Sequence, residues 1–140
     1  MGEGPEYDRR YLAGIQFFNR RDFFEAHEAW EELWHDCLPE HRRFYQALIQ
    51  AAVALHHWHN GNWRGAKRLF ESGRRYMSVY PDPFLGLAVG PFWQEMERAA
   101  AEALNEAPPD DQARLDLALA PTIELAPPPA PWPEMPTRDD

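Results

Sequence analysis

Apolar residues recur at every third or fourth position through most of the first hundred residues, which is the spacing of one face of an α-helix. The pattern predicts five helices, over about residues 8–19, 22–36, 40–60, 63–80 and 91–106. Residues that stop helices separate several of them, namely Leu38-Pro39, Gly61 and Pro81-Asp82-Pro83. The sequence therefore predicts an all-α fold, an antiparallel bundle of about five helices.

A weak internal repeat suggests how these helices are paired. Residues 22–31 align with residues 62–71, so that an N-cap residue, an aromatic residue, an alanine, a second aromatic residue and a glutamate coincide. Asp22 and Asn62 are the predicted N-caps, and Glu25 would complete a variant of the capping box after Asp22. The pattern resembles the helix-turn-helix repeats of the tetratricopeptide kind, although their period of about 34 residues is shorter. It predicts two stacked helical hairpins.

Two of the predicted helices carry polar stripes beside their apolar faces. On a helical wheel, the helix over 22–36 has a flank of polar and aromatic residues next to its core side. The helix over 40–60 is apolar around most of its circumference, apart from one line of polar residues. Burying amide and imidazole groups without partners costs about 1–3 kcal/mol each, so the two stripes are expected to face each other. The predicted cluster consists of His27, Glu28, Glu31, Trp34, Gln46, Gln50 and His57.

Three interpretations of this cluster remain open from the sequence. It could be a hydrogen-bond network that fixes the register of the two helices. It could be a small-molecule or peptide pocket, polar at its base and aromatic at its rim. It could also hold a divalent metal ion through His27, Glu31 or Glu28, and His57, because helical bundles build metal sites from Glu and His one turn apart. No helix carries the His-Glu-x-x-His motif, so no metal or other cofactor is assigned.

Charge divides the chain into two parts. Residues 106–140 hold eight of the 23 acidic side chains and only two of the 14 basic ones, and seven prolines follow position 120. The sequence predicts a helical domain over residues 1–107 and a largely disordered, acidic, proline-rich tail over 108–140. The nearly balanced charge of the first part argues against nucleic-acid binding. The arginines over 63–80 are interpreted as a solvated face that could attract an anionic partner.

The remaining features concern location and assembly. A single cysteine, Cys37, excludes an internal disulfide. The first ten residues are polar and charged, and no stretch approaches the roughly 18 apolar residues of a membrane span, so a cytoplasmic protein that does not enter membranes is expected. The abundance of aromatic residues on short helices makes a homodimer a further expectation.

Several motifs resemble one family when they are read in order. They are Phe18-Asn-x-x-x-Phe-Phe-Glu-Ala-His-Glu-x-x-Glu-x-x-Trp34, then Phe44-x-Gln-x-Leu-Ile-Gln-x-Ala-x-Ala-Leu-His-His57, and Gly61-Asn-x-x-Gly-Ala66. Over roughly residues 11 to 75 the chain resembles the DUF309 family of small bacterial and archaeal helical proteins. The resemblance implies an all-helical bundle and includes most of the predicted cluster, but it implies no activity.

These observations lead to a functional hypothesis with two alternatives. The chain is expected to be a non-enzymatic binding or interaction module, with a protein or a small molecule as its partner. A metal-dependent enzyme that uses the predicted cluster is the first alternative. A purely structural, oligomer-forming protein is the second.

Overall fold

A computed structural model describes residues 7–100 and 119–136. In order, its elements are α1 (Arg9–Asn19), α2 (Phe23–Asp36), the 3-10 turn η1 (Pro39–His41), α3 (Arg42–His59), α4 (Trp63–Met77) and α5 (Val89–Ala99). No strand occurs within those residues, and only Phe84 and Leu87 form an isolated bridge. The predicted all-α class and the count of five helices are confirmed.

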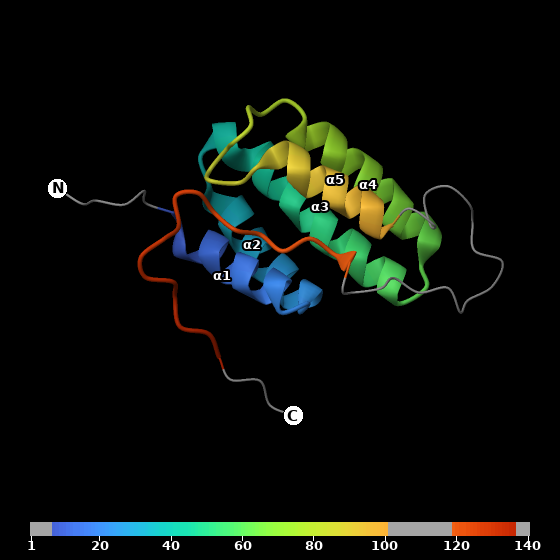
Figure 1. Ribbon diagram of the computed structural model, residues 1–140, viewed down its shortest axis with the longest axis horizontal. Helices are drawn as coiled ribbons and strands as arrows, with labels where there is room; N and C mark the ends of the chain where they lie inside the picture. The colour runs from blue at the N-terminus through green and yellow to red at the C-terminus, as the bar shows by residue number, and fades with distance from the viewer. Residues whose placement is uncertain (1–6, 101–118, 137–140) are drawn as a thin grey trace.

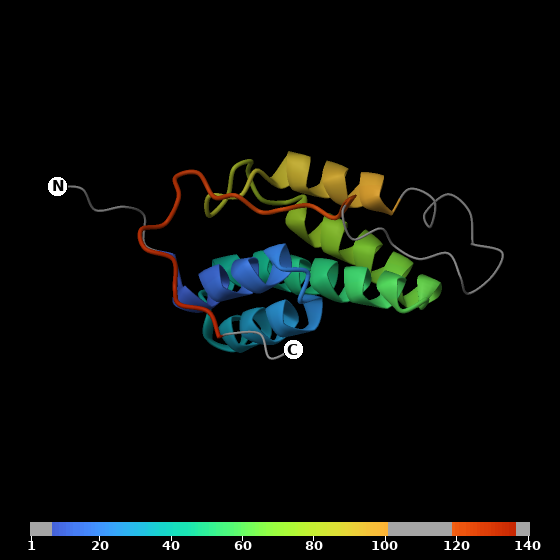
Figure 2. The same cartoon turned by 60° about the horizontal axis from the view of Figure 1, so that its bottom comes forward.

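Helix α3 lies at the centre of the bundle. Its buried residues face several directions around the helix: Phe44, Tyr45, Ala47, Leu48, Ala51, Ala52, Ala54, Leu55 and Trp58. It packs against α2 on one side and α4 on another, and α1 packs against α2. Figure 2 shows α2 at one edge of the bundle and α5 at the other, with α1, α3 and α4 between them. Pairing of α1 with α2 and of α3 with α4 is what two stacked hairpins require. The likeness to tetratricopeptide repeats stays a prediction.

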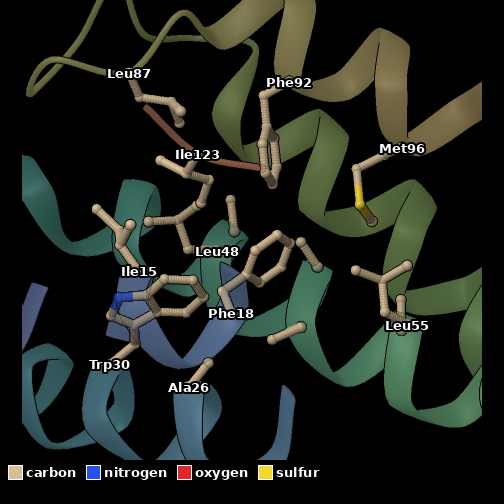
Figure 3. Packing of buried hydrophobic residues seen from close by; sticks show 14 of the residues in the cluster. Ile15, Phe18, Ala26, Trp30, Leu48, Leu55, Leu87, Phe92, Met96 and Ile123 are labelled. Carbon is tan, nitrogen blue, oxygen red and sulfur yellow. The ribbon is translucent and has the colours of Figure 1, made fainter. Parts of the chain in front are cut away.

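The crossing of α1 and α2 is close because Gly14 has no side chain. A Cβ atom at Gly14 would overlap the indole of Trp30, which is fully buried. The indole Nε1 donates a hydrogen bond to the carbonyl oxygen of Tyr11, over 3.1 Å. Figure 3 shows the Trp30 ring beside Ile15 and Phe18 in the core. This contact fixes the position of α2 relative to the rest of the bundle.

Helix ends differ from the sequence prediction in three places. Asp22 occupies the N-cap position of α2, but its side chain makes no capping hydrogen bond there and lies 3.3 Å from the guanidinium of Arg20. Pro39 begins a separate 3-10 turn before α3, since proline fits the first turn of a helix but cannot lie within one. Asp82 caps α5, because its two carboxylate oxygens accept hydrogen bonds from the amides of Val89 and Gly90.

The segment 119–136 also differs from the prediction, which assigned it to a disordered tail. It runs across the bundle between α1 and α5 (Figures 1 and 2). Ile123 and Leu125 are buried, and Ile123 lies between Leu87 and Phe92 in the core (Figure 3). The side chain of Asn19 both donates to the carbonyl and accepts from the amide of Ile123. The prolines that suggested disorder are compatible with an extended strand-like path, and the apolar residues between them provide the attachment.

The predicted boundary between residues 107 and 108 falls outside the described residues. The same holds for the predicted continuation of α5 to residue 106. Among the described residues, no helix combines the length and the apolar character needed to cross a bilayer.

Candidate functional site

One flank of α2 carries four residues at intervals of three and four, so they lie on one side of the helix. They are Phe24, His27, Glu31 and Trp34, and His56 of α3 lies beside the first of them. We refer to these five residues as the α2 stripe. The neighbouring flank of the same helix, with Phe23, Ala26, Trp30 and Leu33, is buried in the core. The α2 stripe therefore lies between the core side and the solvent side of α2, with Phe24 exposed and the other four residues partly buried.

His27 and Glu31 form the polar centre of the α2 stripe. The imidazole Nε2 lies 2.6 Å from a carboxylate oxygen of Glu31, one helical turn further along. The other ring nitrogen, Nδ1, is buried and has no hydrogen-bond partner. A neutral ring that donates through Nε2 keeps a free lone pair on Nδ1, and a protonated ring would have a free donor there. His27 is thus oriented by one partner and left with unused hydrogen-bonding capacity.

Phe24 is an exposed aromatic residue next to these polar groups. Its side chain is 51% exposed, although a phenylalanine usually lies in the core. Its ring centroid lies 5.6 Å from that of His27 and 6.0 Å from that of His56. Three rings from two helices therefore form one partly exposed aromatic and imidazole surface.

Trp34 forms the far end of the α2 stripe. The guanidinium of Arg42 lies over its ring, 4.3 Å from the centroid, which is a favourable cation–π distance. The indole Nε1 is buried and has no hydrogen-bond partner. A buried donor without a partner costs about 1–3 kcal/mol, so this end of the stripe also carries unused hydrogen-bonding capacity.

The rest of the predicted cluster makes no hydrogen bond to His27 or Glu31 among the described residues. Gln50 accepts a hydrogen bond of 2.7 Å from the hydroxyl of Ser72 in α4, so its amide faces α4 and not α2. His57 is half-buried and lies beside His56, while burial and then His56 lower its pKa. Gln46 is half-buried and Glu28 is exposed. Within the described chain, no hydrogen bond joins the glutamines or His57 to His27, Glu28 or Glu31.

The divergence has a geometric cause. The prediction placed the glutamine line of α3 against α2, but α3 packs between two helices, and Gln50 turns toward the second of them. In the described ranges 7–100 and 119–136, no three His, Cys, Asp or Glu side chains are close enough together to hold a metal ion.

A cavity that opens near the start of α1 was not predicted from the sequence. It has a volume of about 260 Å³ and is lined by Tyr7, Asp8, Arg10, Tyr11, Leu33, Asp36, Cys37, Leu38, His41, Tyr45 and Leu85. Arg10 forms ion pairs with Asp8 and with Asp36, at 3.1 and 2.9 Å, and these contacts raise its pKa. The cavity forms where the start of α1, the end of α2 and the start of α3 converge. No local sequence motif predicts such a convergence.

Two tyrosines line this cavity with different hydrogen bonding. The hydroxyl of Tyr11 donates to the carbonyl oxygen of Leu85, whereas the hydroxyl of Tyr45 has no hydrogen-bond partner among the described residues. Burial raises the pKa of Tyr45, and the negative charge of Asp8 adds to the effect. Burial also raises the pKa of the Cys37 thiol, so Cys37 stays protonated and is poorly suited to act as a nucleophile.

Together these features define a class of protein: a small helical-bundle domain with a partly exposed imidazole, carboxylate and aromatic stripe along its second helix. Comparison with protein families gives the same result as the sequence motifs. Residues 11–69, from α1 into α4, match the family described as "Domain of unknown function (DUF309)", which confirms the resemblance. The match includes the whole of the α2 stripe.

Two relatives have names but no described function. "Uncharacterized protein YpuF" of Bacillus subtilis (strain 168) is 42% identical over 66 residues, which are 46% of this chain and 38% of that protein. An "Uncharacterized protein" of Aquifex aeolicus (strain VF5) is 35% identical over 74 residues, 52% of this chain and 22% of that protein. The chain therefore spans less than two fifths of the length of either relative. No solved structure matches it.

Proposed function

We propose that this domain is a non-enzymatic interaction module that binds a partner protein through the α2 stripe. The observation that supports the proposal most strongly is the exposure of Phe24 between His27 and His56. Exposed aromatic groups next to polar groups with unused hydrogen-bonding capacity are typical of protein interfaces, where tyrosine, tryptophan, phenylalanine and arginine are enriched. The expected cytoplasmic location is part of this proposal.

A protein is a better partner for this surface than a small molecule. The stripe follows the length of one helix, whereas small ligands prefer concave pockets that enclose most of their surface. From Phe24 to Trp34 the stripe extends along about 15 Å of helix, since each residue adds about 1.5 Å. This length suits the face of another helix or of a small domain.

A stability measurement separates a binding surface from a structural network. We expect Phe24→Ala and His27→Ala each to change the free energy of unfolding by no more than about 0.5 kcal/mol, because Phe24 is exposed and the ion pair of His27 with the partly exposed Glu31 contributes little. Phe23→Ala is the matched control, since Phe23 precedes Phe24 but is buried, and its loss should cost about 3–5 kcal/mol. Urea titration measures all three. A loss of about 2 kcal/mol or more in His27→Ala would favour a structural network.

The metal-dependent alternative has its own test. A divalent ion bound by the folded state would raise the melting temperature by mass action. We expect zinc and manganese to leave the melting temperature of the protein unchanged. A clear rise that is lost in both His27→Ala and Glu31→Ala would replace the interaction module with a metal site.

A further inference from the structure

The two helices that pack against α3 carry opposite charges. Helix α2 has five carboxylates and neither lysine nor arginine, whereas α4 has five cationic side chains and one carboxylate, Glu71. All six of these α4 groups are exposed. The whole chain has a formal charge of −9, so a cationic helix is not a consequence of composition. This distribution makes the outer side of α4 a local positive region on an acidic protein.

The cations of α4 extend onto the start of α3. Arg64, Arg68, Glu71 and Arg75 recur at intervals of three or four and share one side of α4, with Lys67 and Arg74 next to them. Tyr76 of α4 connects this side with α3, because the guanidinium groups of Arg43 and Arg75 lie 4.7 and 5.6 Å from its ring centroid. We call the resulting surface the basic face: Arg43, Arg64, Lys67, Arg68, Arg74 and Arg75.

Most of these cations lack an opposite charge. Among the described residues, only Arg74 of the basic face forms an ion pair, with Glu97 of α5 at a distance of 3.8 Å. A shallow hollow lined by Phe70, Glu71, Arg74, Arg75 and Ser78 opens at the same place. Like charges held together repel each other, which costs folding free energy and is relieved when an anionic partner binds.

We infer that the basic face docks an acidic segment of a partner protein. Charge complementarity identifies the class of partner, and the arginine and tyrosine side chains are those that contribute most at protein interfaces. Single-stranded nucleic acid fits less well, because bases need open aromatic faces and Tyr76 is already flanked by two guanidinium groups. This inference does not depend on the α2 stripe.

Fluorescence anisotropy with a labelled acidic peptide tests the inference. The probe is a helical peptide of about 16 residues with glutamates one turn apart, and a peptide with glutamine at those positions is its uncharged counterpart. The full chain should bind the glutamate peptide and not the glutamine peptide. Arg43→Glu combined with Arg75→Glu should weaken binding by about tenfold or more. The matched control is Arg9→Glu with Arg98→Glu, which changes the net charge equally at exposed positions on α1 and α5 and should leave binding within about twofold.

Several results would overturn the inference. Equal losses in the two double variants would show a general charge effect, and absence of binding by the unmodified chain would remove the docking surface. Tighter binding of a single-stranded RNA oligonucleotide, or of vesicles rich in anionic phospholipid, would assign the basic face to that ligand. Light scattering that detects self-association, lost in the Arg43→Glu and Arg75→Glu variant, would assign it to a second copy of this chain.

Discussion

At the scale of single residues, the most informative group is the hydroxyl of Tyr45. It is attached to a side chain that is only 4% exposed, and it has no hydrogen-bond partner among the described residues. We expect Tyr45→Phe to leave the free energy of unfolding unchanged or to raise it, because the substitution removes a polar group that the fold does not use. Tyr80→Phe is the control: the Tyr80 hydroxyl donates to the carbonyl oxygen of Glu40 and accepts from the amide of Phe44, so its loss should cost about 1 kcal/mol.

The same tyrosine predicts a dependence of stability on pH. Burial raises the pKa of Tyr45 and of Tyr11 above the unperturbed value of 10.0. A group whose pKa is raised in the folded state contributes stability below its unfolded pKa, and this contribution is lost as the pH rises toward the folded pKa. Stability should therefore fall above about pH 10, and it should fall less in Tyr45→Phe. An identical alkaline loss in both proteins would contradict the assigned burial of Tyr45.

The sequence could identify most residues of the α2 stripe but not their partners. His27, Glu31 and Trp34 follow from helical periodicity within one helix, and the prediction found them. Phe24 was missed because a phenylalanine is expected in the core, and His56 because it points away from the polar line of α3. The partner of Gln50 is a serine in α4, and the rotation of α3 between two helices decides this contact.

At the scale of elements, the closest approach is that of α1 and α2 at Gly14. A methyl group at this position would overlap the buried indole of Trp30. We expect Gly14→Ala to destabilise the protein by about 3 kcal/mol or more, because overpacking forces either the ring or the helix to move. Gly61→Ala is the comparison, since position 61 has open space but a φ of +85°, and it should cost about 1–2 kcal/mol.

A second variant tests the contact between Gly14 and Trp30 even if Gly14→Ala alone does not fold. The cost of Gly14→Ala should be smaller in a Trp30→Leu background, because the smaller side chain leaves room for the methyl group. Additive costs, measured by urea titration, would show that the crossing does not depend on this contact.

Helix positions were predictable because local signals determine them. Gly61 has the positive φ expected for the residue after a helix, and the side chain of Asn62 accepts a hydrogen bond from the amide of Gly65 at the start of α4. The capping role of Asp82 was not predicted, since Asp82 lies seven residues before its partner Val89 and reaches it only through the intervening loop.

At the scale of the whole molecule, the segment 119–136 connects the two sides of the bundle. Ile123 is buried, whereas its neighbour Thr122 is exposed. We expect Ile123→Asp to lower the free energy of unfolding by about 3 kcal/mol or more, because it buries a charge without a partner. Thr122→Asp, the matched control, should stay within about 0.5 kcal/mol of the unmodified protein.

Truncation distinguishes the structure from the prediction made from composition. A tail without contacts could be removed at no cost, whereas loss of residues 119–140 should lower the melting temperature because Ile123 and Leu125 leave the core. An unchanged melting temperature after truncation would support the original prediction that this segment is disordered. Composition could not predict this packing, because it depends on three apolar residues that are buried among many prolines. They are Ala120, Ile123 and Leu125.

The α2 stripe as a contact surface is the central claim, and site-specific crosslinking in the cells that make the protein tests it most directly. A photoreactive benzophenone analogue of phenylalanine replaces Phe24, and the same analogue replaces Val79, which is 75% exposed but lies outside the α2 stripe. Irradiation should give a crosslinked species of discrete mass from position 24, weaker in a His56→Asp background and absent from position 79. Equal or no crosslinking at the two positions, at the same protein level, would contradict the claim.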